Sequence, residues 1–260
     1  MTTPLVVVHH DADVLAEAVA ARLITRIADV QAARGEASVV LTGGGVGIAS
    51  LAAIARSPAR SAVDWGRLEV WWGDERFLPS GHAERNETQA RDALLDQVPV
   101  RVDRVHPMPA SDAEDVRGAP EAAADVYRAT LAAWAHPENH SRVPAFDVLL
   151  LGVGPDAHVA SLFPDQPALY EIRPVVAVHG APKPPPIRLT LTLPAIRSAH
   201  EVWLVVAGDE KAAAVRMALS GAGEVQVPAA GARGRHRTLW LLDRAAASAL
   251  PRGLERIASP

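Results

Sequence analysis

The sequence predicts an α/β protein in which residues 1–260 form a single domain, a mostly parallel, doubly wound sheet with helices on both faces. Strand-like and helix-like segments alternate almost throughout the chain, as they do where helices connect parallel strands. Several strand-like segments are continuous apolar runs, which are typical of strands buried on both faces. The hydrophobic fraction of 49% supports a substantial core, and no loose segment is long enough to separate two domains.

Apolar runs of strand length occur at regular intervals along the chain. The run at 146–151 is too short for a typical helix and suits a buried parallel strand. The strands that we expect lie at 5–8, 38–41, 68–72, 104–108, 146–151, 175–178, 188–193, 202–207 and 238–242.

Capping residues and helix breakers mark the helices between these strands. Asp11 or Asp13 can cap the first long helix, Gly35 ends it, and Asn86 is interpreted as the cap of a later helix. Residues 159–163 can start a short helix that Pro164 ends. The other helices that we expect lie at 14–33, 48–56, 86–97, 121–135 and 209–219, with one more at the C-terminus.

Composition excludes several classes of function. A net charge of −4 gives no reason to expect nucleic acid or an acidic membrane as a partner. The absence of cysteine excludes disulfides, cysteine zinc sites and thiol catalysis. The N-terminal residues lack the basic region and long apolar stretch of a signal peptide, and no run approaches the length of a membrane helix. We therefore expect a soluble cytoplasmic protein, and a monomer.

A glycine turn, Gly43-Gly44-Gly45, connects an expected strand to an expected helix. Glycines there allow backbone N–H groups to approach an anion, and the helix N-terminus adds partial positive charge, so we expect a phosphate. The alternative is a tight turn without a ligand. The turn is not a Walker loop, because no Gly-Lys-Ser/Thr follows it.

Charged residues follow other strands at their carboxyl ends. Asp74-Glu75-Arg76 comes after the strand at 68–72, and its alternative interpretation is a solvated loop. Arg76 can grip a carboxylate or phosphate with two hydrogen bonds. Lys183 and Arg188 bracket a stiff run of three prolines, and Lys211 lies at the start of a helix. Several cations near strand ends predict a small phosphorylated substrate.

His158 is the strongest candidate for chemistry, because it follows a buried strand and a glycine turn and because histidine exchanges protons at neutral pH. Asp156 lies two residues before it and is placed to hold one tautomer. A lone histidine is more often structural, but this position favours a functional role. Gly152-Val153-Gly154-Pro155-Asp156-Ala157 also matches a dinucleotide fingerprint, yet Asp156 would then put a carboxylate where a pyrophosphate sits. Asp-x-His could bind a metal, but no third ligand has recognisable spacing.

Five segments together resemble the 6-phosphogluconolactonase family, of the type related to glucosamine-6-phosphate isomerases and deaminases. They span almost the whole chain in the expected order, which makes the set far more specific than any one motif. The segments are LTGGGVGIASL (41–51), WWGDERFLPSGHAERN (71–86), FDVLLLGVGPDAHVASLFP (146–164), KPPPIRLTLTLPAI (183–196) and VWLVVAGDEKAAAV (202–215).

The resemblance implies a Rossmann-like fold and hydrolysis of 6-phospho-D-glucono-1,5-lactone to 6-phosphogluconate in the pentose phosphate pathway, with no cofactor and no metal. It implies that His158 is the general base that activates water. It places Asp74, Arg76 and Asp156 around the reacting carbonyl and the sugar hydroxyls. The glycine turn, Arg188 and Lys211 would hold the 6-phosphate.

Two positions depart from the family pattern. A hydroxyl residue commonly follows the paired glycines where this chain has Gly45, so one phosphate hydrogen bond is expected to be missing. The glycine that usually precedes the catalytic histidine is Ala157 here, and a positive φ at this position would strain it by about 1–2 kcal/mol.

Two rival functions remain on the same fold. Glucosamine-6-phosphate deaminases typically read D-E-Y at the second segment and carry an acidic residue in an F-N-E-P-like run after the histidine. This chain has Arg76 and Ser161-Leu162-Phe163-Pro164 instead, which favours the lactonase. Non-catalytic sugar-phosphate sensors usually carry a DNA-binding domain, and we expect none, since the first strand starts at Leu5.

Overall fold

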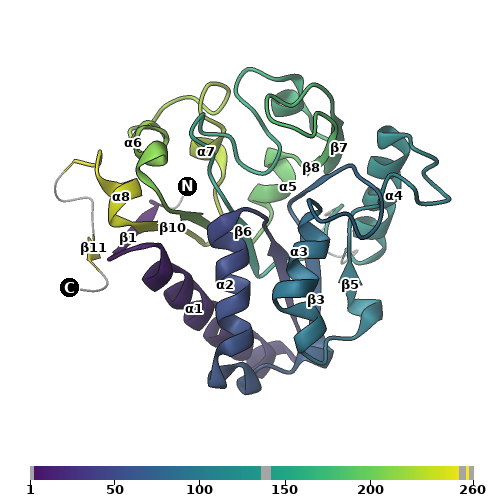
Figure 1. Ribbon diagram of the computed structural model, residues 1–260, viewed down its shortest axis with the longest axis horizontal. Coiled ribbons are helices and arrows are strands. Elements are labelled where there is room, and N and C mark those ends of the chain that lie inside the picture. The colour runs from purple at the N-terminus through teal and green to yellow at the C-terminus, as the bar shows by residue number, and fades with distance from the viewer. Residues whose placement is uncertain (1–2, 136–141, 252–255, 258–260) are drawn as a thin grey trace.

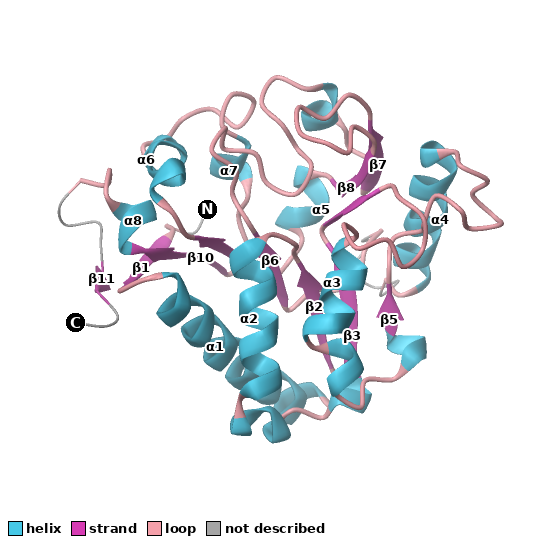
Figure 2. Ribbon diagram, viewed as in Figure 1, coloured by secondary structure: helices cyan, strands magenta, loops and turns pink. Residues whose placement is uncertain are grey.

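The computed structural model describes residues 3–135, 142–251 and 256–257. Strands and helices alternate along the chain (Figure 2), which confirms the predicted fold class. The strands are β1 (Leu5–His9), β2 (Ala37–Leu41), β3 (Leu68–Trp72), β4 (Asp74–Arg76), β5 (Val105–His106), β6 (Val148–Leu151), β7 (Val175–Val178), β8 (Arg188–Leu191), β9 (Glu201–Val206), β10 (Arg237–Asp243) and β11 (Arg256–Ile257). The helices are α1 (Ala12–Arg34), α2 (Gly45–Arg56), α3 (Asn86–Ala93), α4 (Pro120–Ala133), α5 (Leu193–Arg197), α6 (Ala212–Leu219), α7 (Pro228–Gly231) and α8 (Arg244–Ala247).

The main sheet has eight strands in the order β11-β1-β10-β9-β6-β2-β3-β5, and every neighbouring pair is parallel. β2, β3, β6 and β9 are buried along their whole length, because helices cover both faces. None of the helices in the described part of the chain is long and apolar enough to cross a bilayer.

Alternate residues of the central strands enter two separate cores, as the two-residue period of a strand requires. Val39 and Leu150 pack in the core beneath α1, α2 and α3, which lie side by side on one face (Figure 1). Val40 and Leu149 pack in the core on the other face, which α4 to α8 help to cover. Helices therefore pack on both faces of the main sheet, as predicted.

Three strands lie outside the main sheet. β7 and β8 (Figure 1) form a small antiparallel sheet with β4. In this sheet Asp74 is paired with Thr190 and Arg76 with Arg188. This sheet lies beyond the carboxyl ends of the parallel strands, because β4 continues from β3 after only Gly73. The interpretation of residues 74–76 as a solvated loop is wrong, since Asp74 and Glu75 are both buried.

Helix ends agree with the caps predicted for α1. Asp11 accepts a hydrogen bond from the backbone N–H of Val14, and Gly35 ends the helix in the left-handed region with φ of 88°. The predicted helix at 86–97 is shorter, because α3 ends at Ala93 and a separate 3₁₀ turn follows. The predicted C-terminal helix is the four-residue α8.

Candidate active site

A cleft opens where the strand order of the main sheet reverses. From β2 the chain adds β3 and β5 on one side, and later it adds β6, β9 and β10 on the other. Open parallel sheets bind ligands at such a switch point, beyond the carboxyl ends of the strands. A cavity of about 290 Å³ lies there, between the turns that follow β2 and β6. The predicted site residues that line it are Gly43, Gly44, Gly45, Asp74, Arg76, His158, Arg188 and Lys211.

The glycine turn leads from β2 into α2. Gly44 is the N-cap and has φ of 85°, a conformation that glycine adopts without strain. No side chain caps α2, so the N–H groups of its first turn remain available for an anion. A Cβ on Gly45 would meet nothing within 4 Å, so glycine is not required there by sterics.

His158 is held by Asp156 at the mouth of the turn after β6. Its Nδ1 lies 2.5 Å from Asp156 Oδ1, and a carboxylate accepts the proton of that nitrogen. Nε2 is therefore the nitrogen free to accept a proton, and the ring lines the cleft. Partial burial raises the pKa of Asp156, but the hydrogen bond and charge of His158 outweigh it, so the net pKa is lowered. Asp156 stays ionised and does not itself line the cavity.

The backbone between Gly154 and His158 is bent sharply. Gly154 N–H donates to the carbonyl of His158, and a Cβ on Gly154 would overlap the imidazole ring and Asp156. Ala157 has φ of 66° and is fully buried, so the positive φ considered from the sequence is present. This conformation costs about 1–2 kcal/mol in a residue with a Cβ.

Asp74 faces the cleft from β4 and is fixed by two neighbours. Its Oδ2 accepts a hydrogen bond of 2.7 Å from the Ser161 hydroxyl, and its Oδ1 lies 3.4 Å from Asn86 Nδ2. The short helix predicted at 159–163 is wrong. Val159 and Leu162 instead form a bridge around a tight turn, with Ala160 at φ of 49°. This turn directs the buried Ser161 toward Asp74, which a local helix preference cannot reveal.

Two arginines face each other across β4 and β8. Arg76 donates to the carbonyl of Glu84 over 2.5 Å. Arg188 donates to the carbonyls of Lys183, Pro184 and Pro185, so the proline run holds the guanidinium by its carbonyl groups. Burial lowers the pKa of Arg188, while the charge of Asp74 opposes this shift.

Cations dominate the charge of the cleft. Lys183 and Lys211 line it with Arg76 and Arg188, and Asp74 is the one carboxylate among the described lining residues. Lys211 lies at the start of α6, as predicted, and its ammonium is 3.7 Å from Glu210. Four cations against one carboxylate suit an anionic ligand such as a phosphate.

Asn86 is a lining residue that the sequence did not indicate, and its interpretation as a helix cap is wrong. Arg85 occupies the cap position of α3, and no side chain of α3 caps the helix. The buried carboxylate of Glu75 replaces the cap, because it accepts the backbone N–H groups of Asn86 and Glu87 at 2.7 and 2.9 Å. The Asn86 side chain is thus free to enter the site.

The arrangement follows from the strand that residues 74–76 form in the structure. Side chains alternate along a strand, so a strand at 74–76 places Asp74 and Arg76 on one side and Glu75 on the other. Glu75 is fully buried and lies 3.8 Å from the buried Arg85 guanidinium. Its burial raises the pKa of its carboxyl to about 7, although Arg85 and three backbone N–H groups oppose the shift.

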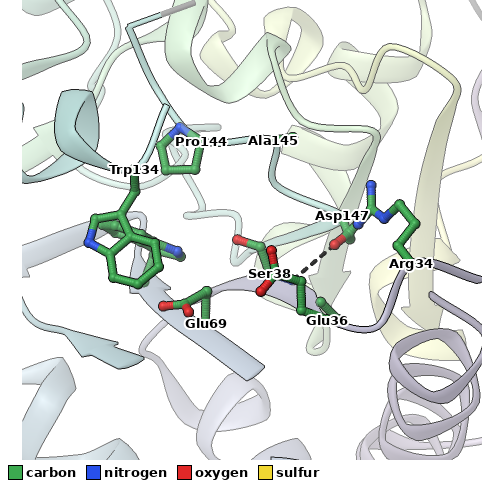
Figure 3. A pocket seen from close by; sticks show the side chains of 10 residues that line it. Arg34, Glu36, Ser38, Glu69, Trp134, Pro144, Ala145 and Asp147 are labelled. Carbon is green, nitrogen blue, oxygen red and sulfur yellow. Dashed lines mark hydrogen bonds and ion pairs between the residues drawn. The ribbon is translucent and has the colours of Figure 1, made fainter. Parts of the chain in front are cut away.

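A second hollow lies at the amino ends of β2, β3 and β6 (Figure 3). Its carboxylates are already paired. Asp147 accepts from Arg34 and from the backbone N–H of Ser38, and Glu69 lies 2.6 Å from His106 and 2.7 Å from Arg104. These pairs make the hollow a structural polar cluster. His106 is buried and belongs to this cluster.

The described residues contain no group of three His, Asp or Glu side chains that could hold a metal ion.

Comparisons with known proteins show the family to which the chain is related. Residues 10–240 match the family model described as glucosamine-6-phosphate isomerases/6-phosphogluconolactonase. The chain is 66% identical to a 6-phosphogluconolactonase of Streptomyces coelicolor over 97% of both chains. It is 52% identical to that of Mycobacterium tuberculosis, over 93% of this chain and 96% of the relative.

Solved structures show the same fold. The 6-phosphogluconolactonase of Trypanosoma brucei superposes with a TM-score of 0.82 at 27% identity, over 96% of this chain and 100% of that one. A monomeric glucosamine-6-phosphate deaminase superposes with a TM-score of 0.77 at 20% identity, over 95% of this chain and 100% of that one. The fold is thus shared by proteins with different activities, and the family match rests on the sequence. This chain belongs to the family of glucosamine-6-phosphate isomerases and 6-phosphogluconolactonases.

Proposed function

We propose that this protein is a 6-phosphogluconolactonase, which hydrolyses 6-phospho-D-glucono-1,5-lactone to 6-phospho-D-gluconate in the pentose phosphate pathway. The observation that carries the proposal is the pairing of His158 with Asp156 at the edge of a cationic cleft. The pair supplies a general base, and the cations supply a seat for the phosphate. The identity of 66% to a protein of that name supports the same activity.

The phosphate end of the substrate binds at the glycine turn. The N–H groups at the start of α2 point toward a bound anion, and Arg188 and Lys211 contribute positive charge from two other elements. These groups come from separate parts of the chain and surround the phosphate. They therefore orient the sugar and also strengthen its binding. This anchoring presents the lactone ring to His158.

His158 then takes part in two steps of lactone hydrolysis, first as a base and then as an acid. Its Nε2 takes a proton from a water as the water oxygen attacks the lactone carbonyl, and the carbonyl oxygen becomes a tetrahedral oxyanion. Arg76 is a cation near that position, and it stabilises the negative charge. As the bond from the carbonyl carbon to the ring oxygen breaks, the imidazolium returns its proton to that oxygen. Asp156 holds the imidazole of His158 in place and stabilises the imidazolium in both steps.

The second candidate is a glucosamine-6-phosphate deaminase on the same fold. Deaminases of this family typically carry an acidic residue shortly after the histidine, and this chain has Ser161-Leu162-Phe163-Pro164 there. Ser161 is buried and bonded to Asp74, so it does not replace that acid. A sensor that binds sugar phosphates without turnover is the third alternative.

The test measures hydrolysis of freshly made lactone against its spontaneous opening. Glucose-6-phosphate dehydrogenase supplies the lactone, and 6-phosphogluconate dehydrogenase reports the product. We expect the wild-type protein to accelerate hydrolysis, and His158→Ala to lower kcat by roughly 10²- to 10⁴-fold. His236→Ala is the matched control, because His236 is exposed and precedes the amino end of β10, whereas the cleft lies beyond the carboxyl ends of the strands.

Each outcome separates the alternatives. A folded wild-type protein that fails to accelerate lactone opening would refute the lactonase. Release of ammonia from glucosamine 6-phosphate would then support the deaminase, and binding of a sugar phosphate without turnover would support the sensor. The cytoplasmic location, the monomeric state and the independence from metals and cofactors stay predictions.

A further inference from the structure

Asn86 is a buried side chain of the cleft, and only one of its two polar atoms has a hydrogen-bond partner among the described residues. It lies at the first position of α3 and lines the cavity, yet only 2% of the residue is exposed. Its Nδ2 donates to the backbone carbonyl of Asp74 over 2.9 Å. Its Oδ1 has no hydrogen-bond partner among residues 3–135, 142–251 and 256–257.

The orientation of this amide is determined by its neighbours. A backbone carbonyl can only accept, so the amide nitrogen must face Asp74 and the oxygen must face away from it. The side chain lies against Gly43 on the side where a Cβ would point, and a Cβ there would overlap Oδ1. Gly43 therefore leaves room for the amide beside the glycine turn.

The backbone of Asn86 is held just as firmly. Its N–H donates to Glu75 Oε1 over 2.7 Å, and the same oxygen accepts the N–H of Arg76 at 2.8 Å. One buried carboxylate thus connects the start of α3 to β4. The backbone of Asn86 is therefore fixed, and the bond from Nδ2 to the Asp74 carbonyl holds the amide itself, so its oxygen is a preorganised acceptor beside the glycine turn.

A buried acceptor without a partner is unfavourable, and it favours a ligand that donates to it. The proposed substrate has few donors. Its phosphate dianion, its carbonyl and its ring oxygen can only accept, whereas its hydroxyls at C2, C3 and C4 can donate. We propose that Asn86 is a specificity-determining residue whose Oδ1 accepts a hydrogen bond from one of these sugar hydroxyls. This inference rests on the proposed function.

The experiment compares the parent lactone with three analogues that lack the hydroxyl at C2, C3 or C4. Hydrolysis is followed by proton release, because the analogues need not be substrates of the coupling enzyme. Asn86→Leu removes both polar atoms at similar volume, and Asn86→Ala is the second variant in case leucine prevents folding. Gln89→Leu is the matched control, since Gln89 lies on the same helix and donates to the Ala83 carbonyl outside the cleft.

We expect the wild-type protein to disfavour one deoxy lactone by roughly ten- to hundredfold in kcat/KM. Asn86→Leu should lose about the same factor on the parent lactone and hydrolyse that analogue as the wild type does. The discrimination ratio would then fall to about one, whereas Gln89→Leu should keep the wild-type ratio. A merely structural role cannot produce this pattern, because it would affect all four lactones alike.

Three results would overturn the inference while leaving the lactonase intact. The wild type could hydrolyse all four lactones equally well. Both Asn86 variants could slow every lactone by one common factor, which would indicate a role in holding the water or the glycine turn. They could also leave all rates unchanged. Failure of the wild type on the parent lactone would refute the proposed function, and this inference with it.

Discussion

Replacing the buried Glu75 with glutamine should make the free energy of unfolding less dependent on pH. The Glu75 side chain is fully buried, and burial raises the pKa of its carboxyl from an ordinary 4.5 to about 7. A carboxyl whose folded pKa is raised binds more protons in the folded state between these two pH values. Its stabilising effect is therefore complete below about pH 4.5 and is lost as the pH rises through about 7.

The magnitude follows from the two pKa values. One pKa unit corresponds to about 1.4 kcal/mol, so the shift from 4.5 to about 7 amounts to about 3 kcal/mol. Glutamine does not titrate and can still accept backbone N–H groups through its oxygen. We therefore expect the free energy of unfolding of Glu75→Gln to rise by up to about 3 kcal/mol relative to that of the wild type as the pH rises from 5 to 8.

Urea unfolding at several pH values in this interval measures the effect, because the difference between two variants cancels the titration of the rest of the chain. Glu114→Gln is the control, since Glu114 is exposed and its difference from the wild type should stay flat. A flat difference for Glu75→Gln, or a wild type that gains stability relative to Glu75→Gln as the pH rises, would refute the reasoning. The second result would mean that Arg85 and the three N–H groups outweigh the cost of burial.

Two further changes test the geometry of the cleft. Gly154→Ala should lower kcat by roughly a hundredfold or more, because the new methyl group would overlap His158 and displace it from the reacting carbonyl. Steady-state kinetics measures kcat for this variant. A kcat equal to that of the wild type would contradict the structure. Gly45→Ser should leave stability nearly unchanged, because nothing lies within 4 Å of the new Cβ, and should lower KM by roughly tenfold through one more hydrogen bond to the phosphate. An unchanged KM in a folded Gly45→Ser protein would show that the turn does not contact the phosphate.

Local patterns in the sequence were sufficient for the main sheet and for the centre of the site. Parallel strands buried on both faces produce apolar runs, so the central strands could be located without knowledge of their neighbours. The pair of Asp156 and His158 is also local, because two residues separated by one alanine can meet through a single tight turn. The strained conformation of Ala157 was anticipated from the family resemblance, because a glycine usually occupies that position.

Features that depend on distant partners escaped the sequence. Residues 74–76 form a strand because they pair with β8, more than a hundred residues later, and charged residues carry little strand preference of their own. Residues 159–163 were expected to start a short helix, but the bond from Ser161 to Asp74 favours a tight turn.

The sequence by itself determined the layers of the fold and the candidate base, because both follow from contacts between residues that are close along the chain. Only the tertiary structure decided the lining of the cleft. Asn86 was expected to cap a helix, but the buried carboxylate of Glu75 accepts the N–H groups at the start of α3 instead. The side-chain amide of Asn86 therefore lines the site. The physical reason is that a polar side chain satisfies whichever partner the fold brings near, and distant partners leave no local pattern.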